Sequence, residues 1–244
     1  MTTIKKLFES EFPSILLKQY AEISNKWSLL ISEKLQENNS FSEPFESVGT
    51  QEEIEIYNKA EKFLALQNAL EDIDIVFTFL KVDRNKILEL YPNLNTQENY
   101  YKYHLENFII RTYTIIDSLG KLGNAIYKTE IKDCNCYKLK ERIKKEYPEV
   151  ALSLESILTY SRENKTRRHN KIHSGEIEIS EIKNIPFWED YADVLPETFD
   201  IKNSLLLSMT NEKIENMIVD LKSYIEELIG KINIFLDKSI NQIQ

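Results

Sequence analysis

Residues 104–128 read HLENFIIRTYTIIDSLGKLGNAIYK, and this stretch decides the fold. Its apolar side chains recur at three- and four-residue spacings, which is the period of one face of an α-helix. The residues on that face are Leu105, Phe108, Ile109, Ile116, Leu119 and Ile126. We therefore predict a long helix over about 97–128, starting after Asn95-Thr96, with one side buried in a core.

The same helical period recurs along most of the chain. Further helices are predicted at 14–38, 51–90 with a kink near Asp83, 137–146, 149–173 and 210–240. The last carries the stripe Ile214, Ile218, Leu221, Ile225, Leu228 and Ile232, and the acidic residues 176–200 before it are predicted to be weakly structured. With no internal repeat and no set of strands, the fold class is all-α, an antiparallel up-and-down bundle of long helices.

The length suits one large helical domain or at most two small ones, and we predict a single all-α domain over residues 1–244. Residues 1–50 either join its core or form an N-terminal helical extension. The chain has 244 residues, 42% of them hydrophobic, with no apolar run long enough to cross a membrane and no signal-peptide pattern, so we predict a cytoplasmic protein without a membrane partner. A net charge of −9 argues against a broad basic surface for nucleic acid but leaves room for one local basic patch.

The two cysteines, Cys134 and Cys136, form a lone C-x-C with no second pair and no flanking histidine. A four-ligand zinc site needs more donors than this, so both are predicted to be reduced thiols. No other Cys/His set or carboxylate cluster has metal-site spacing. We predict no metal and no cofactor.

Residues 161–175, SRENKTRRHNKIHSG, hold two of the three histidines and three of the six arginines. If residues 149–173 form one regular helix, its apolar seam from Val150 extends to Arg168, and His169 and His173 lie one turn apart on its flank. One interpretation is that cations in a last helical turn interact with the helix dipole, by about 0.3–1 kcal/mol each. That interpretation leaves unexplained why Arg168 occupies the seam, where an unpaired charge is costly.

The segment RRHNKIH has an R-x4-H spacing from Arg168 to His173. It resembles the R-x(4–6)-H motif of the HEPN superfamily (higher eukaryotes and prokaryotes nucleotide-binding), in which the residue after Arg is typically polar, as His169 is here. Residues 104–128 are also similar to the long helix that packs beside the motif helix in stand-alone bacterial members. The resemblance covers about 97–240, the HEPN-like core.

The resemblance implies a bundle of four to five helices that commonly dimerises and brings two motif copies to one cleft. Many such proteins are metal-independent endoribonucleases, and others act as antitoxins, scaffolds or nucleotide binders. We therefore predict RNA cleavage through 2′-OH attack, in a toxin or defence protein. The alternative is a non-enzymatic binding or regulatory protein, antitoxin-like or a nucleotide-binding scaffold. RNA or a nucleotide, a second copy of the chain, and an antitoxin or nucleotidyltransferase are the partners that the resemblance implies.

The resemblance assigns proton transfer to His173 and the phosphate contact to Arg168. His169 and Asn170 would position these groups or the RNA. A local basic rim around them would consist of Arg162, Lys165 and Lys171.

Four residues of the 104–128 stretch carry open alternatives. For His104 and Arg111, packing or a surface ion pair is favoured over a role in a site. Glu106 or Asp117 could hold the motif arginine if their helix packs against the motif helix. Just before and within this stretch, the run ENYYKYHLENF could stack on RNA bases, although packing at the helix start is the favoured interpretation.

Overall fold

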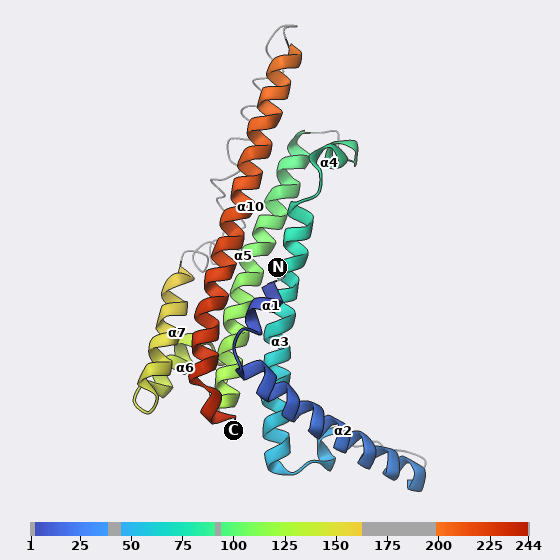
Figure 1. Ribbon diagram of the computed structural model, residues 1–244, viewed down its shortest axis with the longest axis vertical. Coiled ribbons are helices and arrows are strands. Elements are labelled where there is room, and N and C mark those ends of the chain that lie inside the picture. The colour runs from blue at the N-terminus through green and yellow to red at the C-terminus, as the bar shows by residue number, and fades with distance from the viewer. Residues whose placement is uncertain (1–2, 39–44, 91–93, 163–198, 244) are drawn as a thin grey trace. The chain divides into compact units, whose positions relative to one another are not determined.

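The structure is a computed structural model that describes residues 3–38, 45–90, 94–162 and 199–243. Within these ranges all regular secondary structure is helical (Figure 1), which confirms the predicted all-α class. The long helices are α2 (Phe12–Asn38), α3 (Gln51–Leu80), α5 (Leu94–Ile126) and α10 (Phe199–Lys238). The short ones are α1 (Thr3–Leu7), α4 (Arg84–Leu90), α6 (Cys136–Ile143), α7 (Pro148–Tyr160) and the 3-10 helices η1 (Phe45–Val48) and η2 (Ile240–Gln242).

The chain divides into two compact units. Unit 1 consists of Met1–Ala69, Thr114–Tyr160 and Ile229–Gln244, and unit 2 of Leu70–Tyr113 and Ser161–Leu228. Helices α3, α5 and α10 each contribute residues to both units.

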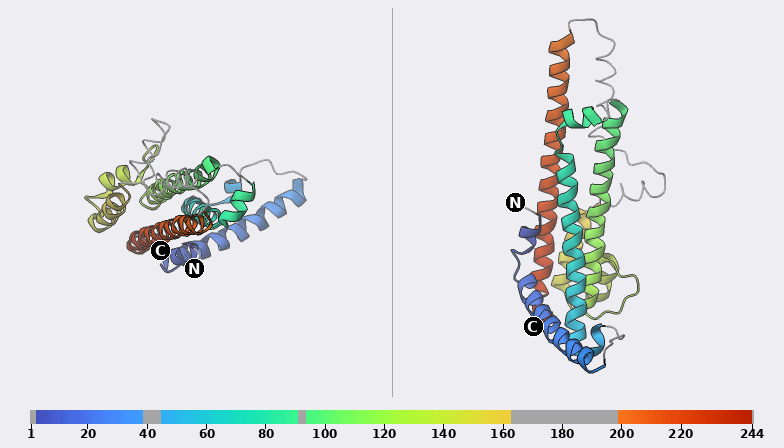
Figure 2. Two further views of the ribbon diagram at one scale, coloured as in Figure 1. Left: turned by 90° about the horizontal axis from the view of Figure 1, so that it is seen from above. Right: turned by 90° about the vertical axis from the view of Figure 1, so that its right-hand side faces the viewer.

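In unit 1, α3 and α7 run opposite in direction to α5 and α10 (Figures 1 and 2). Large side chains of unit 1 with no exposed surface include Trp27 and Phe12 on α2, Phe63 on α3 and Phe235 on α10. Residues far apart in sequence meet here. The Ser10 hydroxyl bonds the Asp237 carboxylate at 2.5 Å, and the Asn233 amide donates to the Lys6 carbonyl at 2.8 Å.

Helix α6 packs against α5 at two glycines. A Cβ added at Gly120 would lie 2.5 Å from the backbone of Asn135 and Cys136, and one at Gly123 would meet the Leu139 side chain. The close approach lets the buried Cys136 thiol donate to the Ile116 carbonyl, with Sγ and O 3.0 Å apart. The glycines of the fold-deciding stretch therefore serve as a docking surface for α6.

Glu53 joins the start of α3 to α2. The backbone N–H of Thr50 donates to Glu53 at 2.9 Å, and the Glu53 N–H donates to the Thr50 hydroxyl at 3.3 Å, a reciprocal capping box. From α2, Lys26 Nζ at 2.5 Å and Trp27 Nε1 at 3.2 Å also donate to the Glu53 carboxylate. The Lys26 hydrogen bond, together with those of Thr50 and Trp27, lowers the pKa of Glu53 to about 2.

The lowered pKa of Glu53 predicts a loss of stability in acid. Because the pKa falls from 4.5 to about 2 on folding, the ionised carboxylate stabilises the protein above about pH 4.5, and this contribution is lost as the pH falls toward 2. We expect Glu53→Gln to lower the urea midpoint at pH 7 and the gap to wild type to narrow below pH 4.5. An equal gap at every pH would contradict this account.

In unit 2, α3, α5 and α10 are held together by aromatic contacts. The ring centroids of Phe77 and Phe108 are 5.8 Å apart, and those of Phe108 and Tyr224 are 6.2 Å apart. The apolar stripe predicted for the last helix belongs to α10. Its buried members are Ile214, Ile218, Ile225, Leu228 and Ile232. The predicted stripe of α5 is likewise buried at all six positions.

The element boundaries differ most from the predicted ones at three places. The helix predicted over 51–90 is two, because α3 ends at Leu80 and α4 begins after Asp83, whose carbonyl accepts from the Lys86 N–H at 3.0 Å. The predicted kink is thus a break. The helix predicted from 210 begins at Phe199, so the prediction of weak structure up to residue 200 was wrong for its last two residues. The helix predicted over 149–173 ends at Tyr160.

Candidate functional site

Arg162 is the one predicted site residue that the structure describes. It is exposed and follows a buried turn residue, Ser161, directly after α7. The other predicted site residues lie outside the described residues: Lys165, Arg168, His169, Asn170, Lys171 and His173.

Helix α7 leads into this segment. Its buried side chains include Val150, Leu154 and Ile157, as the predicted seam requires. Helix α7 ends at Tyr160, Ser161 forms a turn and Arg162 is helical again, so the regular helix predicted over 149–173 is interrupted at Ser161. Serine favours turns since its hydroxyl can bond nearby backbone groups in non-helical conformations. Arg168 lies outside the described residues, so its place on this seam stays a prediction.

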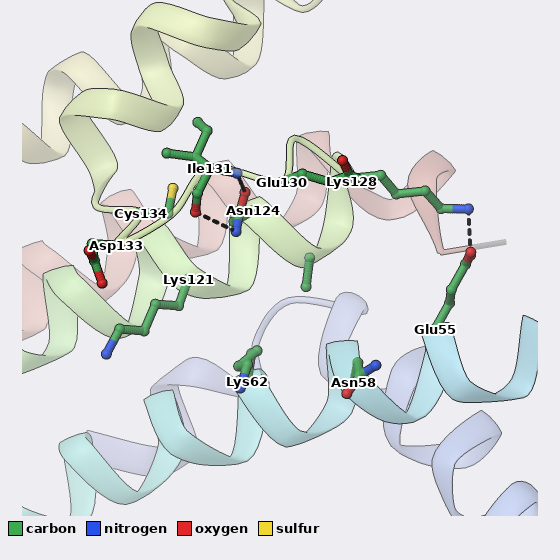
Figure 3. A pocket seen from close by; sticks show the side chains of 11 residues that line it. Glu55, Asn58, Lys62, Lys121, Asn124, Lys128, Glu130, Ile131, Asp133 and Cys134 are labelled. Carbon is green, nitrogen blue, oxygen red and sulfur yellow. Dashed lines mark hydrogen bonds and ion pairs between the residues drawn. The ribbon is translucent and has the colours of Figure 1, made fainter. Parts of the chain in front are cut away.

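Unit 1 contains a pocket of about 450 Å³ between α3 and the end of α5 with its following loop (Figure 3). Glu55, Asn58 and Lys62 line it from α3. The opposite wall is made of Lys121, Asn124, Ala125, Lys128, Glu130, Ile131, Asp133 and Cys134. Sequence reasoning did not bring these residues together. Their spacings of three and four along each helix mark one face of α3 and one of α5, but pairing the two faces requires the fold.

Asn124 holds the loop that closes this pocket. Its side-chain oxygen accepts from the Ile131 N–H at 3.0 Å, and its amide donates to the Ile131 carbonyl at 3.3 Å (Figure 3). The same oxygen also accepts from the Thr129 hydroxyl. Three non-glycine residues of the loop, Lys128, Glu130 and Asp133, have positive φ angles of 47°, 54° and 51°. The Asn124 bonds offset the cost of this backbone conformation.

Charges of both signs line the pocket. Lys128 pairs with Glu55, and this hydrogen bond lowers the pKa of the Glu55 carboxyl. Behind them the buried Lys59 donates to the Gln242 carbonyl at 3.0 Å, and burial, then the nearby Lys128 charge, lower its pKa. With three lysines and three carboxylates in its lining, the pocket has no excess charge that would select an anion or a cation.

Cys134 and Cys136 are free and buried. Burial raises the pKa of both thiols, so neither is a reactive thiolate at neutral pH. Among the described residues, no group of three or more His, Cys, Asp and Glu is placed to hold a metal ion.

His104 has a packing role. It is 8% exposed, and its ring stacks on Phe79 with centroids 4.9 Å apart and planes 8° apart. Burial lowers the pKa of His104, which keeps the ring neutral at pH 7. The packing interpretation of His104 is confirmed.

Arg111 and the tyrosines near His104 also serve structure. Arg111 forms a surface ion pair with Asp72 at 2.8 Å, as one of the two alternatives proposed. The Tyr100 hydroxyl donates to the Phe79 carbonyl at 2.8 Å, and Tyr101 is buried. Tyr103 is 61% exposed. Helix-start packing thus accounts for two of the tyrosines in this run.

A family model described as HEPN_Cthe2314-like HEPN matches residues 55–239, well over half of the 244 residues. The chain belongs to the HEPN family. Searches of curated proteins and of solved structures gave no significant match. The match confirms the resemblance drawn from the sequence, and its range includes both stretches that suggested it, residues 104–128 and 168–173.

The HEPN match extends beyond the core predicted over 97–240 at its N-terminal side, and includes most of α3. The pocket residues of α3 therefore lie within the HEPN region. No helix in the described part of this HEPN chain combines the length and the apolar character needed to cross a membrane.

Proposed function

We propose that this HEPN chain is a metal-independent endoribonuclease in which Arg168 and His173 carry out the reaction. The observation that supports the proposal is the R-x4-H spacing of these two residues in a chain that belongs to the HEPN family. The pocket of unit 1 is not part of the proposal, because its lining contains no histidine and no arginine.

The proposed chemistry requires a proton carrier and a cation. The 2′-OH of a ribose attacks the adjacent phosphorus, the P–O5′ bond breaks, and the products are a 2′,3′-cyclic phosphate and a 5′-OH. Histidine, with an unperturbed pKa of about 6.5, can move the proton at neutral pH. Arginine can hold two phosphate oxygens with its planar guanidinium while negative charge builds up on them. His173 has the first role and Arg168 the second.

Two copies of the chain would supply each role twice. We propose a homodimer with both R-x4-H segments at one cleft, since two-fold symmetry places the same surface of each copy at the interface. His169 and Asn170 would position the RNA, and Arg162, Lys165 and Lys171 would form the basic rim. The activity would belong to a cytoplasmic toxin or defence protein, controlled by an antitoxin or a nucleotidyltransferase partner.

The purified protein should cleave single-stranded or looped RNA in the presence of EDTA. Since the proposed reaction uses the 2′-OH and no metal, chelation should leave the rate unchanged, and a DNA oligonucleotide of the same sequence should stay intact. Mass spectrometry of the fragments should show 2′,3′-cyclic phosphate ends. Cleavage that stops on chelation, or that also degrades the DNA, would refute the proposed mechanism and favour the non-enzymatic alternative or a contaminant.

A further inference from the structure

The end of α5, the loop after it and α6 form a basic segment in an acidic chain. Residues 121–145 contain eight Lys or Arg and three Asp or Glu, which gives this segment a net charge of +5, while the whole chain carries −9. The segment belongs to unit 1. A concentration of one charge on the surface attracts a partner of the opposite charge, here a polyanion.

Lys138 joins the loop to the first turn of α6. Its ammonium donates to the Asp133 carbonyl at 3.1 Å and to the Lys132 carbonyl at 3.5 Å. Lys121 of α5 lies beside the same loop, because it lines the same end of the pocket as Asp133 (Figure 3). Three lysines from α5, the loop and α6 therefore surround the beginning of α6.

The basic side chains continue along α6. Arg142 comes four residues after Lys138, so the two lie on the same side of the helix. Lys145 follows in the turn after the helix. We call these exposed side chains the α6 surface: Lys121, Lys132, Lys138, Arg142 and Lys145.

The lysines of the α6 surface have no carboxylate partner in the part of the chain that the structure describes. The ion pairs of this region are made by Lys140 with Glu155 and by Lys144 with Glu141. Arg142 of the α6 surface pairs with Glu146 at 3.8 Å, but both side chains are more than half exposed. Such a surface pair is weak, so a phosphate can take the place of the carboxylate.

An exposed aromatic ring lies among these cations. Tyr137, in the first turn of α6, is 58% exposed, and the Lys140 ammonium lies 5.3 Å from the centre of its ring. Proteins bind single-stranded nucleic acid with this combination, in which cations contact the phosphates and aromatic rings stack on the bases. An acidic protein surface would need the cations alone.

We propose that the α6 surface and Tyr137 bind single-stranded RNA. The cations contact phosphates of the backbone, and the Tyr137 ring stacks on one base. Helix α6 packs against α7, the helix from which the chain continues to the R-x4-H segment. The α6 surface thus holds RNA through contacts that take no part in the reaction. The inference rests on the proposed function for the identity of the ligand, and its test does not depend on cleavage.

The test measures the binding of a single-stranded 2′-O-methyl RNA oligonucleotide, which cannot be cut by 2′-OH attack, by fluorescence anisotropy at several salt concentrations. The variant is Lys121→Gln/Lys132→Gln/Lys145→Gln. These three side chains are exposed and form no hydrogen bond or ion pair within the described residues, so the fold should be kept. We expect binding to weaken roughly ten- to a hundredfold at low salt. The slope of log K against log salt should become shallower by about 2, since each phosphate neutralised on a single strand contributes about 0.7.

The matched control is Lys5→Gln/Lys18→Gln/Lys213→Gln, which removes the same charge from exposed positions on α1, α2 and α10. It should leave the salt slope close to that of wild type. If the variant of the α6 surface binds as tightly as wild type, the inference is wrong. If the control weakens binding to the same extent, net charge alone attracts the RNA, and the inference is wrong as well.

The stacking contact has a test of its own. Tyr137→Ala should weaken binding of the single strand about fivefold or more without changing the salt slope, and Tyr137→Phe should bind like wild type because it keeps the ring. Binding of an RNA duplex, whose bases are already stacked, should not respond to Tyr137→Ala. If Tyr137→Ala binds the single strand as tightly as wild type, the ring does not stack on a base. The α6 surface would then fit any polyanion, an acidic protein included, and the assignment of single-stranded RNA would be overturned.

Failure of the proposed catalysis would give a different result. Cleavage would then be independent of His173, while the binding of the 2′-O-methyl oligonucleotide and its dependence on the α6 surface would remain as expected.

Discussion

Replacing His173 with Ala should lower the rate of RNA cleavage by about 10²–10⁴, the usual contribution of general acid–base catalysis by one side chain. Without the imidazole, proton transfer at the 2′-OH and at the leaving 5′-oxygen is left to water. Oligonucleotide affinity should change little, because the neutral form of histidine adds no charge to the surface. The measurement is a single-turnover rate with a fluorescent RNA at saturating protein.

Arg168→Lys should be nearly as damaging. Lysine keeps the positive charge but has no planar fork, so it cannot hold two phosphate oxygens at once. Lys165→Ala is the matched control within the same basic segment. It should weaken RNA binding modestly and leave the rate at saturation close to wild type.

Both variants must be shown by light scattering and circular dichroism to keep the fold and oligomeric state of the wild type. Equal cleavage by wild type and His173→Ala would mean that a contaminating ribonuclease is responsible, and the regulatory or binding alternative would replace the enzyme. A rate loss in Lys165→Ala as large as that in Arg168→Lys would argue that charge alone is needed.

Gly120→Ala should be among the most destabilising single-methyl changes in the chain. Its Cβ would lie 2.5 Å from the backbone carbon of Asn135 and from the backbone nitrogen of Cys136, and backbone cannot turn aside as a flexible side chain can. We expect the substitution to move α6 away from α5 and to break the hydrogen bond from the Cys136 thiol to the Ile116 carbonyl. We expect a loss of about 3 kcal/mol in the free energy of unfolding, the upper end for an overpacked core.

Gly230→Ala is the matched control for this experiment. Gly230 also lies in a long helix, but nothing lies within 4 Å of an added Cβ. Alanine there should stabilise the protein by about 0.5–1 kcal/mol through the better helix propensity. Urea unfolding of both variants measures the contrast. If Gly120→Ala is as stable as Gly230→Ala, the close approach of α6 to α5 is wrong.

The helices with a clear apolar stripe were predictable from the sequence. In α5 and α10, the apolar side chains at helical spacing are buried. A long amphipathic helix removes its apolar face from water only when that face is turned toward the core. The break before α4 was visible at Asp83, since aspartate favours the residue just before a helix. The family resemblance also followed from two short stretches, and the matched range contains them both.

Other features depend on tertiary contacts that no local pattern encodes. The spacing of apolar residues did not indicate that α7 ends at Tyr160. Ser161 continues the buried face of α7 even though it lies after the end of the helix. The pocket lining joins residues from α3 with residues from α5 and its following loop. These residues are common surface types, so only the packing of the helices shows that they meet. The roles of Arg168 and His173 remain predictions from the sequence.

The contacts between the two ends of unit 1 have a consequence for how the protein is made. The Ser10 hydroxyl donates a hydrogen bond to the Asp237 carboxylate, and the Asn233 amide donates one to the Lys6 carbonyl. In each pair the two residues are 227 positions apart in the sequence. A ribosome adds about 5–20 residues per second, so residues 6–12 would emerge tens of seconds before their partners exist. During that time Phe12 can contact Phe63, but Leu7 and Phe12, both fully buried in the finished protein, lack the part of the core that α10 supplies. Unit 1 therefore closes only after synthesis reaches the end of α10, and the early helices need protection from aggregation until then.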